Sequence, residues 1–190
     1  WYQGESNAES EWRVEQHDSV LKTLVTDWRA QRKRPDLPFL FVQLPAMKRP
    51  HWPAFRASQQ RVHDSLPHTG MAVTIDLGHP TNVHPREKKP VGERLERLAM
   101  AHVYGKPNRG RGPRFESAKQ RGDLLVVRLA NGHRRLRTLD ELPPTGFEVR
   151  DGRGRWSRAE ARIVVGDTLE VASPLGKAVT ALRYAWVPYP

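Results

Sequence analysis

The amino-acid sequence predicts an α/β domain followed by a small antiparallel β module. Up to about residue 105, amphipathic segments with helical spacing alternate with short apolar runs, which is the pattern of a layered α/β architecture. From residue 113 onward the helical periodicity is gone, and short β-like runs alternate with turn residues. We therefore expect two domains, residues 1–112 and residues 113–190.

The first long element expected is a helix from Glu9 to Arg32, after residues 1–8, which suit a strand end that turns into a loop. Apolar side chains of this segment recur at spacings of one, three and four residues, which predicts one buried face. The basic run Arg32–Arg34 and Pro35 end the helix. The predicted face comprises Trp12, Val20, Leu21, Leu24, Val25 and Trp28.

Two apolar runs, Phe39–Leu44 and Gly70–Leu77, predict strands buried on both faces, as in a parallel sheet. Each is followed by a loop and then by a predicted helix, Ala54–Leu66 after the first and Glu87–Val103 after the second. The side chains expected to face inward are Phe55, Val62 and Leu66 in one helix and Val91, Leu95, Leu98 and Val103 in the other.

The Gly-rich segment Gly105–Gly112 reads as a linker to the β module. Turn residues separate the β-like runs beyond it, in pairs such as Asp151-Gly152 that favour tight connections between antiparallel strands. The expected strands are Leu124–Leu129, Gly146–Val149, Ala161–Val165, Thr168–Ala172 and Ala181–Val187, and the other expected turns are Asn131-Gly132, Gly166-Asp167 and Pro174–Gly176.

The composition excludes several classes of protein. No run approaches the roughly 18 apolar residues of a transmembrane helix. The chain has no cysteine, which excludes disulfides, zinc–thiolate sites and cysteine nucleophiles. Because the first residue is Trp1 and no signal-like segment precedes the polar motif that follows, we expect the chain to begin inside a longer protein.

The charge is strongly basic, with 32 Lys and Arg against 21 Asp and Glu among 190 residues, a formal net charge of +11. Such a balance is one mark of nucleic-acid-binding proteins. However, the cations are spread along the chain, and their densest stretch, Lys106–Arg121, contains a single aromatic residue, Phe115, so base stacking has little support. We expect an arginine-rich solvated surface, with no nucleic acid and no membrane as partner.

Two polar clusters, Trp1–Asn7 and Asp76–Pro85, follow predicted strands, and ligands bind at the carboxyl ends of strands in open α/β sheets. In the first cluster, Ser6 comes close to the G-x-S-x-G nucleophile pattern. It also fits a polar residue at a helix start or a structural loop serine, and we favour these two alternatives over a nucleophile. The Gly4 N–H and the Asn7 carboxamide suit donors to an oxyanion, although a loop Asn commonly bonds local backbone instead.

His84, in the second cluster, suits a general base, because imidazole is the usual proton carrier near neutral pH. His79 lies five residues earlier, but no third ligand stands at a suitable spacing, so no metal site is expected. We interpret the other seven histidines as surface residues: His17, His51, His63, His68, His79, His102 and His133.

A basic histidine needs an acid that orients it and stabilises its cation. Glu5 and Asp76 are the candidates in the two clusters. Asn82, two residues before His84, can donate or accept a hydrogen bond but supplies no charge.

Four segments together resemble the sialate O-acetylesterases, carbohydrate esterases of the SGNH hydrolase superfamily. These segments are WYQGESNA, DWRAQRKRPDLPFLFVQL, TGMAVTIDLGHPTNVHPREKKPVGERL and ALRYAWVPYP, and they occur in the order found in the family. The resemblance implies a three-layer SGNH-hydrolase-like parallel sheet, present in part, followed by a β-rich module.

The resemblance also implies roles for individual residues. Gly4 and Asn7 match the block whose glycine N–H and asparagine side chain belong to the oxyanion hole, with Gln3 as a further contributor. His84 matches the catalytic base, and Glu5 of the QGES motif matches the acid that orients it.

This sequence departs from the family pattern in two places. Many relatives have Asp where Asn82 stands, so the departure concerns the acid, a role that we assign to Glu5. Asp76 is interpreted as a structural carboxylate at a strand end. The N-terminal block that carries the family's nucleophilic serine is absent, so we expect these 190 residues alone to be inactive.

The resemblance therefore implies a serine esterase that removes acetyl groups from sialic acid or a related sugar through an acetyl-enzyme. It implies no cofactor, an O-acetylated sugar as partner, and a periplasmic or secreted location. An acetyl xylan esterase, or a non-catalytic relative that binds carbohydrate or nucleic acid, stays open as an alternative. The aromatic residues of Arg183–Trp186 are interpreted as core packing of the β module.

Overall fold

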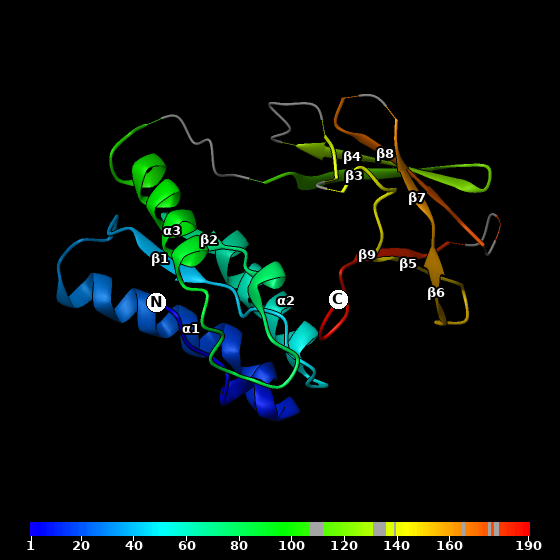
Figure 1. The fold of residues 1–190 in the computed structure, drawn as a ribbon. Helices are drawn as coiled ribbons and strands as arrows, with labels where there is room; N and C mark the ends of the chain where they lie inside the picture. The colour runs from blue at the N-terminus through cyan, green and yellow to red at the C-terminus, as the bar shows by residue number, and fades with distance from the viewer. Residues whose placement is uncertain (107–111, 131–135, 139, 165, 175, 177–178) are drawn as a thin grey trace. The chain divides into compact units, whose positions relative to one another are not determined.

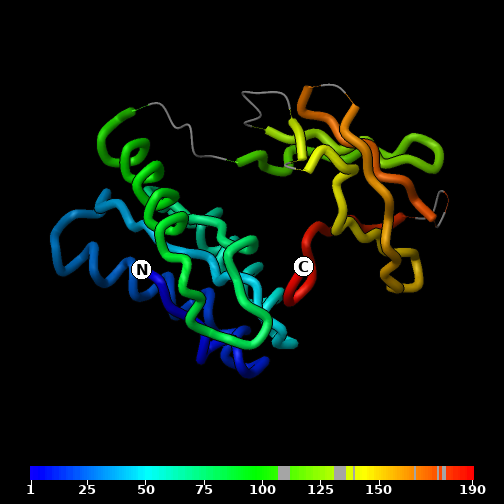
Figure 2. The backbone as a smooth tube through the Cα atoms, in the orientation of Figure 1, coloured from blue at the N-terminus to red at the C-terminus, as the bar shows by residue number. Residues whose placement is uncertain are grey.

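The computed structural model describes residues 1–106, 112–130, 136–138, 140–164, 166–174, 176 and 179–190. The chain divides into two compact units (Figures 1 and 2). The first contains Trp1–Gly110 together with Val187–Pro190, and the second contains Arg111–Trp186. Val187–Pro190, which the sequence analysis assigned to the second domain, thus lie in the first unit.

The first unit is built on a parallel pair of strands, β1 (Phe39–Val42) and β2 (Thr69–Ala72), as the sequence predicts. Trp1 runs along the other edge of β1: its nitrogen donates to the Leu40 carbonyl oxygen at 2.8 Å, and its own carbonyl accepts from the Val42 N–H at 2.9 Å. Its other elements in the described residues are η1 (Asn7–Glu9), α1 (Glu11–Gln31), α2 (Trp52–Ser65), η2 (Ile75–Leu77) and α3 (Lys89–His102).

The second strand is shorter than predicted. The expectation of a strand through Leu77 was wrong, because Ile75–Leu77 forms the single 3-10 turn η2. The chain leaves the sheet at Thr74, whose hydroxyl donates to the Gln43 carbonyl oxygen at 2.6 Å. This bond ties the ends of the two strands together at their carboxyl edge.

Helix α1 confirms the predicted first helix and part of its predicted face, since Leu21 and Val25 are buried and Leu24 packs against the core. Trp12, Val20 and Trp28 are 56%, 57% and 42% exposed. The buried line runs along one side of the helix at spacings of three and four residues and includes two polar side chains that were not predicted. It consists of Val14, His17, Leu21, Val25 and Arg29.

The interpretation of His17 as a surface histidine was therefore wrong. Its side chain is 7% exposed, its ring lies 4.1 Å from the Phe55 ring, and its Nδ1 lies 2.5 Å from the Ser58 hydroxyl. Burial lowers the pKa of this imidazole to about 4. A neutral imidazole with a hydroxyl partner can thus occupy an apolar helix face. Among the others, His68 and His79 are exposed, His51, His63 and His102 are half-buried, and His133 lies outside the described residues.

Helices lie against both faces of β1 and β2. On one face, Phe39, Phe41 and Met71 form a core cluster with α1 and with Val62 of α2. On the other face, His102 of α3 lies over Gly70, where an added Cβ would come within 3.4 Å of the imidazole. Val91 and Leu98 of α3 are buried and Leu95 is half-buried, as expected, whereas Val103 is 50% exposed, contrary to expectation.

The second unit consists of antiparallel strands, in agreement with the sequence. One sheet has the order β3-β4-β8-β7 and the other β6-β5-β9. Alternate side chains of β4, β5 and β8 fill its core, among them Val127, Val149 and Val171. The strands are β3 (Arg114–Arg121), β4 (Leu124–Ala130), β5 (Phe147–Arg150), β6 (Trp156–Ala159), β7 (Ala161–Ile163), β8 (Thr168–Ala172) and β9 (Ala181–Tyr184).

The sequence analysis missed β3 and β6. Almost every residue of β3 is exposed, so no apolar alternation marks it, and it forms by pairing with β4. The predicted turn at Asp151-Gly152 is confirmed, since the Asp151 carboxylate accepts hydrogen bonds from the N–H groups of Arg153 and Arg155 at 2.9 Å. The predicted turn at Asn131-Gly132 and most of the predicted linker lie outside the described residues.

The aromatic residues that follow Leu182 do not lie in the core of the β module, contrary to our interpretation. Tyr184 is 64% exposed and Trp186 is 38% exposed. The guanidinium of Arg183 stacks over the Trp156 ring at 4.0 Å and pairs with Glu148 at 2.8 Å. These side chains therefore form a surface cluster of cation and rings.

None of the helices in the described ranges has both the length and the apolar character that a membrane crossing needs.

Candidate active site

Both polar clusters follow strands whose carboxyl ends lie at one edge of the sheet. Because Trp1 pairs in parallel with β1, the segment Gln3–Asn7 leaves the sheet at the same edge as Gln43–Met47, which follows β1, and Val73–Glu87, which follows β2. Ligand sites of open α/β sheets form at this edge.

Gly4 occupies a position that only glycine can fill. Its φ is +141°, and an added Cβ would lie 2.5 Å from the ring of the buried Phe55. Its carbonyl oxygen accepts a hydrogen bond from the Ala8 N–H at 2.9 Å, which closes the turn into η1. The Phe55 ring and the turn into η1 therefore hold the Gly4 backbone in one conformation.

Asn7 is half-buried at the start of η1. Its side-chain carbonyl accepts a hydrogen bond from the Gln3 amide at 3.5 Å. Within the described residues, the Asn7 NH₂ group makes no hydrogen bond, so it can donate to an added group. This arrangement suits an oxyanion donor.

Ser6 lacks the geometry of a nucleophile elbow. Its backbone is ordinary right-handed helix, with φ −68° and ψ −30°, where an elbow requires a strained turn between strand and helix. Its carbonyl accepts from the Arg13 guanidinium at 3.1 Å. The favoured interpretation, a polar residue at a helix start, fits this position.

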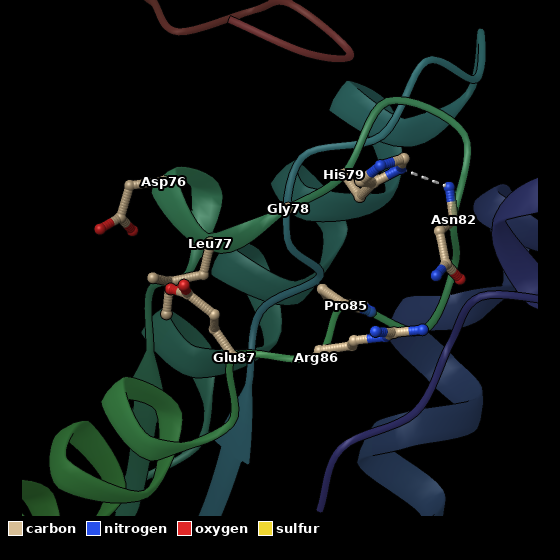
Figure 3. A pocket seen from close by; sticks show the side chains of 8 residues that line it. All are labelled: Asp76, Leu77, Gly78, His79, Asn82, Pro85, Arg86 and Glu87. Carbon is tan, nitrogen blue, oxygen red and sulfur yellow. Dashed lines mark hydrogen bonds between the residues drawn. The ribbon is translucent and has the colours of Figure 1, made fainter.

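His84 stands exposed in the loop between η2 and α3. Its backbone N–H donates to the Asn82 side-chain carbonyl at 2.9 Å, so Asn82 supports the loop backbone rather than the imidazole ring. The His79 ring also shapes this loop, because its Nδ1 accepts from the Asn82 N–H at 2.9 Å (Figure 3). No group of three or more His, Asp or Glu side chains in the described residues could hold a metal ion.

The two clusters converge around His84. Val83 packs against the core cluster that contains Ala8 and Phe55. On the other side of His84, the Lys88 ammonium lies 4.6 Å from the centre of the Tyr2 ring. Lys88 thus joins the loop to the N-terminal segment, and Val83 joins it to the core cluster to which Ala8 of that segment belongs. Burial, and next the nearby charge of Glu5, raise the pKa of the Tyr2 phenol.

Glu5 is half-buried. In the part of the chain that the structure describes, no hydrogen bond joins its carboxylate to the His84 imidazole. The two side chains are brought to the same edge of the sheet, but the expected contact between acid and base is not formed.

Asp76 has a different partner, which the sequence analysis did not find. Its two carboxylate oxygens accept from the two terminal nitrogens of Arg94, each at 2.6 Å, and Arg94 also donates to the Val73 carbonyl at 2.6 Å. The hydrogen bond from Arg94 holds the pKa of this carboxyl below its usual range. A spacing of 18 residues carries no signal of pairing, but the VGERL segment quoted above contains Arg94.

A hollow of about 560 Å³ opens beside the histidine loop (Figure 3). Glu87 points toward Leu77 on one side of it, and Arg86 extends on the side of Asn82. Most of its lining is polar or charged, which suits a hydroxylated ligand. The lining residues are Asp76, Leu77, Gly78, His79, Asn82, Pro85, Arg86 and Glu87.

The chain is similar to known carbohydrate acetylesterases. Residues 1–101 match a family model described as carbohydrate esterase, sialic acid-specific acetylesterase. The chain is 29% identical to the sialate O-acetylesterase of Mus musculus, covering 100% of this chain and 39% of that protein, and 28% identical to that of Homo sapiens, covering 100% and 40%.

Among solved structures, a carbohydrate acetylesterase from Xanthomonas citri matches with a TM-score of 0.91 and 33% identity, over 99% of this chain and 44% of that one. The chain thus spans about two fifths of the length of these relatives. The mixture of parallel and antiparallel sheets described above is similar to the fold of that acetylesterase.

Proposed function

The chain belongs to the carbohydrate esterase family of sialic acid-specific acetylesterases, and from that membership we propose that it is part of a serine esterase that removes O-acetyl groups from sialic acid or a related sugar. The observation that carries the proposal is the convergence of the Tyr2–Ala8 segment with the Val83–Lys88 segment at the carboxyl edge of the strands. In this proposal residues 1–112 are part of a three-layer SGNH-hydrolase-like domain, and residues 113–190 are its β-rich companion.

The reaction proceeds through an acetyl-enzyme. A serine outside these 190 residues attacks the acetyl carbonyl carbon, and His84 accepts its proton and then delivers it to the departing sugar oxygen. The backbone N–H of Gly4 and the NH₂ group of Asn7 donate to the oxyanion, with Gln3 beside them, and each such donor is worth about 3 kcal/mol in the transition state. Water then cleaves the acetyl-enzyme with His84 as its base.

Glu5 is the acid that orients His84 in this mechanism. Asp76 is less suited, because both of its oxygens are engaged by Arg94. In this proposal Glu5 and His84 make contact when the substrate and the serine are in place, since catalytic hydrogen bonds commonly tighten only in the complex.

The experiment uses the longer protein that includes the serine block, with acetate release measured on O-acetylated sialic acid beside acetylated xylan. We expect release from the sialic acid ester, and a loss of about 10⁴-fold or more in kcat for His84→Ala. The exposed His68, replaced by Asn to suit its φ of +56°, is the matched control and should leave kcat unchanged. Activity that survives His84→Ala would refute the proposal, and a preference for xylan would make the sugar a neutral polysaccharide.

A further inference from the structure

The last four residues of the sequence, Val187–Pro190, lie in the first unit, beside the turn that follows β1 (Figure 2). The Met47 N–H donates to the Pro188 carbonyl oxygen at 2.9 Å. From α2, the Arg56 guanidinium donates to the carbonyl oxygens of Val187 and Pro188. The backbone of this segment is therefore bound from two directions.

Arg56 is unusual for an arginine because its side chain is almost entirely buried, at 5% exposure. Burial lowers the pKa of its guanidinium to about 10, so the group stays charged at neutral pH. A buried cation is costly unless its hydrogen bonds are satisfied, and the carbonyl oxygens of Val187 and Pro188 accept two of them. The buried Arg56 guanidinium is therefore stable only when Val187–Pro190 lies beside it.

The turn held in this way touches the start of the histidine loop. The Lys48 N–H donates to the Pro80 carbonyl oxygen at 3.0 Å. Gly78 packs so closely that an added Cβ would lie 1.9 Å from the Ala46 carbonyl oxygen. Val83, next to His84, packs on the cluster that contains the buried Met47. A continuous chain of contacts therefore leads from Pro188 through Met47 and Lys48 to the residues that flank His84.

We propose that Val187–Pro190 is a positioning element for the loop that carries His84, and that Arg56 is the residue that fastens it. The role of the positioned histidine rests on the proposed function, whereas the fastening itself does not. The segment acts through the Ala46–Lys48 turn and touches no substrate.

Amide hydrogen exchange tests the fastening without any assay of activity. Arg56→Met removes every donor of the guanidinium, Arg56→Lys keeps the charge with fewer donors, and Arg61→Met on the same helix removes an exposed arginine that pairs with Asp18. We expect the Lys48 and His84 amides to exchange about 10-fold faster in Arg56→Met, less so in Arg56→Lys, and at the original rate in Arg61→Met. An unchanged rate at the His84 amide overturns the proposal.

Turnover tests the positioning. In the longer, active protein we expect Arg56→Met to lower kcat by about 10- to 100-fold at nearly constant KM, with partial recovery in Arg56→Lys, because small displacements of a base are costly. If kcat per folded molecule is unchanged although exchange is faster, Arg56 is merely structural and the proposal fails. If the exchange result holds but activity does not depend on His84, the proposed function fails and the fastening stands.

Gly78→Ala approaches the same loop from the other side and guards against misfolding of the arginine variants. Its Cβ must push the Ala46 carbonyl away, so it should reproduce the faster exchange at His84 with Arg56 intact. Gly92→Ala, where an added Cβ meets nothing within 4 Å, is the control. A Gly78→Ala protein with normal exchange and kcat counts against the proposed chain of contacts.

Discussion

The two units of the chain stabilise themselves by different means. In the first unit, seven buried side chains are polar or charged, and in the second only two are, among the residues that the structure describes. The first set is His17, Arg29, Arg56, Ser58, Gln59, Thr69 and Thr74, and the second is Asp151 and Ser173.

Three members of the polar set of the first unit, Arg56, Gln59 and Thr74, bond to backbone that leaves the carboxyl edge of the sheet or packs beside it. Gln59 donates to the Val42 carbonyl at 3.1 Å and accepts from the Leu44 N–H at 2.8 Å, and Trp52 donates to the Pro45 carbonyl at 2.7 Å. Apolar contacts are non-directional and hold a core together without fixing a loop, whereas hydrogen bonds fix direction. The difference teaches that the first unit relies on more buried polar side chains than the β module, and that part of this set fixes the backbone at its carboxyl edge.

The largest effect expected from breaking this geometry is that of Gly4→Ala. The added Cβ meets the Phe55 ring at 2.5 Å and the φ of +141° is strained for alanine, so we expect a loss of about 3–4 kcal/mol in the free energy of unfolding. Urea denaturation measures it. Gly92→Ala, in the exposed face of α3, should instead raise stability by about 0.5–1 kcal/mol. Equal and small effects at both positions would contradict the tight packing beneath the oxyanion segment.

The next effect is that of Gln59→Leu. The substitution is close to isosteric but leaves the Leu44 N–H and the Val42 carbonyl unpaired in the interior, at a cost of about 1–3 kcal/mol for the first such group and less for the second. Urea denaturation should show a loss of about 3 kcal/mol. The neighbouring Gln60, whose amide donates to the exposed Asp64 at 2.9 Å, should tolerate the same change within about 0.5 kcal/mol.

The sequence predicted much of this first unit because its elements carry periodic signals. Nearly continuous apolar runs mark the segments that form the parallel strands β1 and β2, and the spacing of apolar residues marks the helices. The expected place of the two polar clusters at the carboxyl ends of strands likewise followed from the order of the elements. The contact of Tyr2 with Lys88 agrees with it.

What the sequence could not predict depends on tertiary contacts. Trp12 and Trp28 look like core residues, yet the buried line of α1 passes through His17, which becomes compatible with burial only through Ser58. The strand β3 has no apolar alternation and exists because β4 pairs with it. The roles expected for Glu5 and His84 stay predictions, since their side chains meet only if loops and substrate bring them together.

A third prediction concerns pH. Burial sets the pKa of His17 at about 4 in the folded state, below its ordinary value of about 6.5, so the unfolded chain binds the proton more readily. Its contribution to stability is complete above pH 6.5 and is lost as the pH falls toward 4, with a decrease of about 2 kcal/mol between pH 7.5 and 5. His17→Gln keeps a hydrogen-bonding group for Ser58 but does not titrate. Urea midpoints of the two proteins should therefore converge as the pH falls, and parallel curves would contradict the buried neutral imidazole.

The smallest effect is expected in the β module, and it sharpens the contrast between the units. Arg162 of β7 and Glu170 of β8 lie opposite each other and pair at 2.6 Å, but the arginine side chain is 72% exposed. Exposed pairs of this kind contribute little because water screens them and ordering two long side chains costs entropy. Glu170→Gln should change the free energy of unfolding by less than about 1 kcal/mol, and that change should vanish in high salt. Urea denaturation at low and high ionic strength measures both. A loss as large as that of Gln59→Leu would mean that the β module, too, depends on directed polar contacts, and the difference between the two units would then lie in where those contacts are placed rather than in how much each unit relies on them.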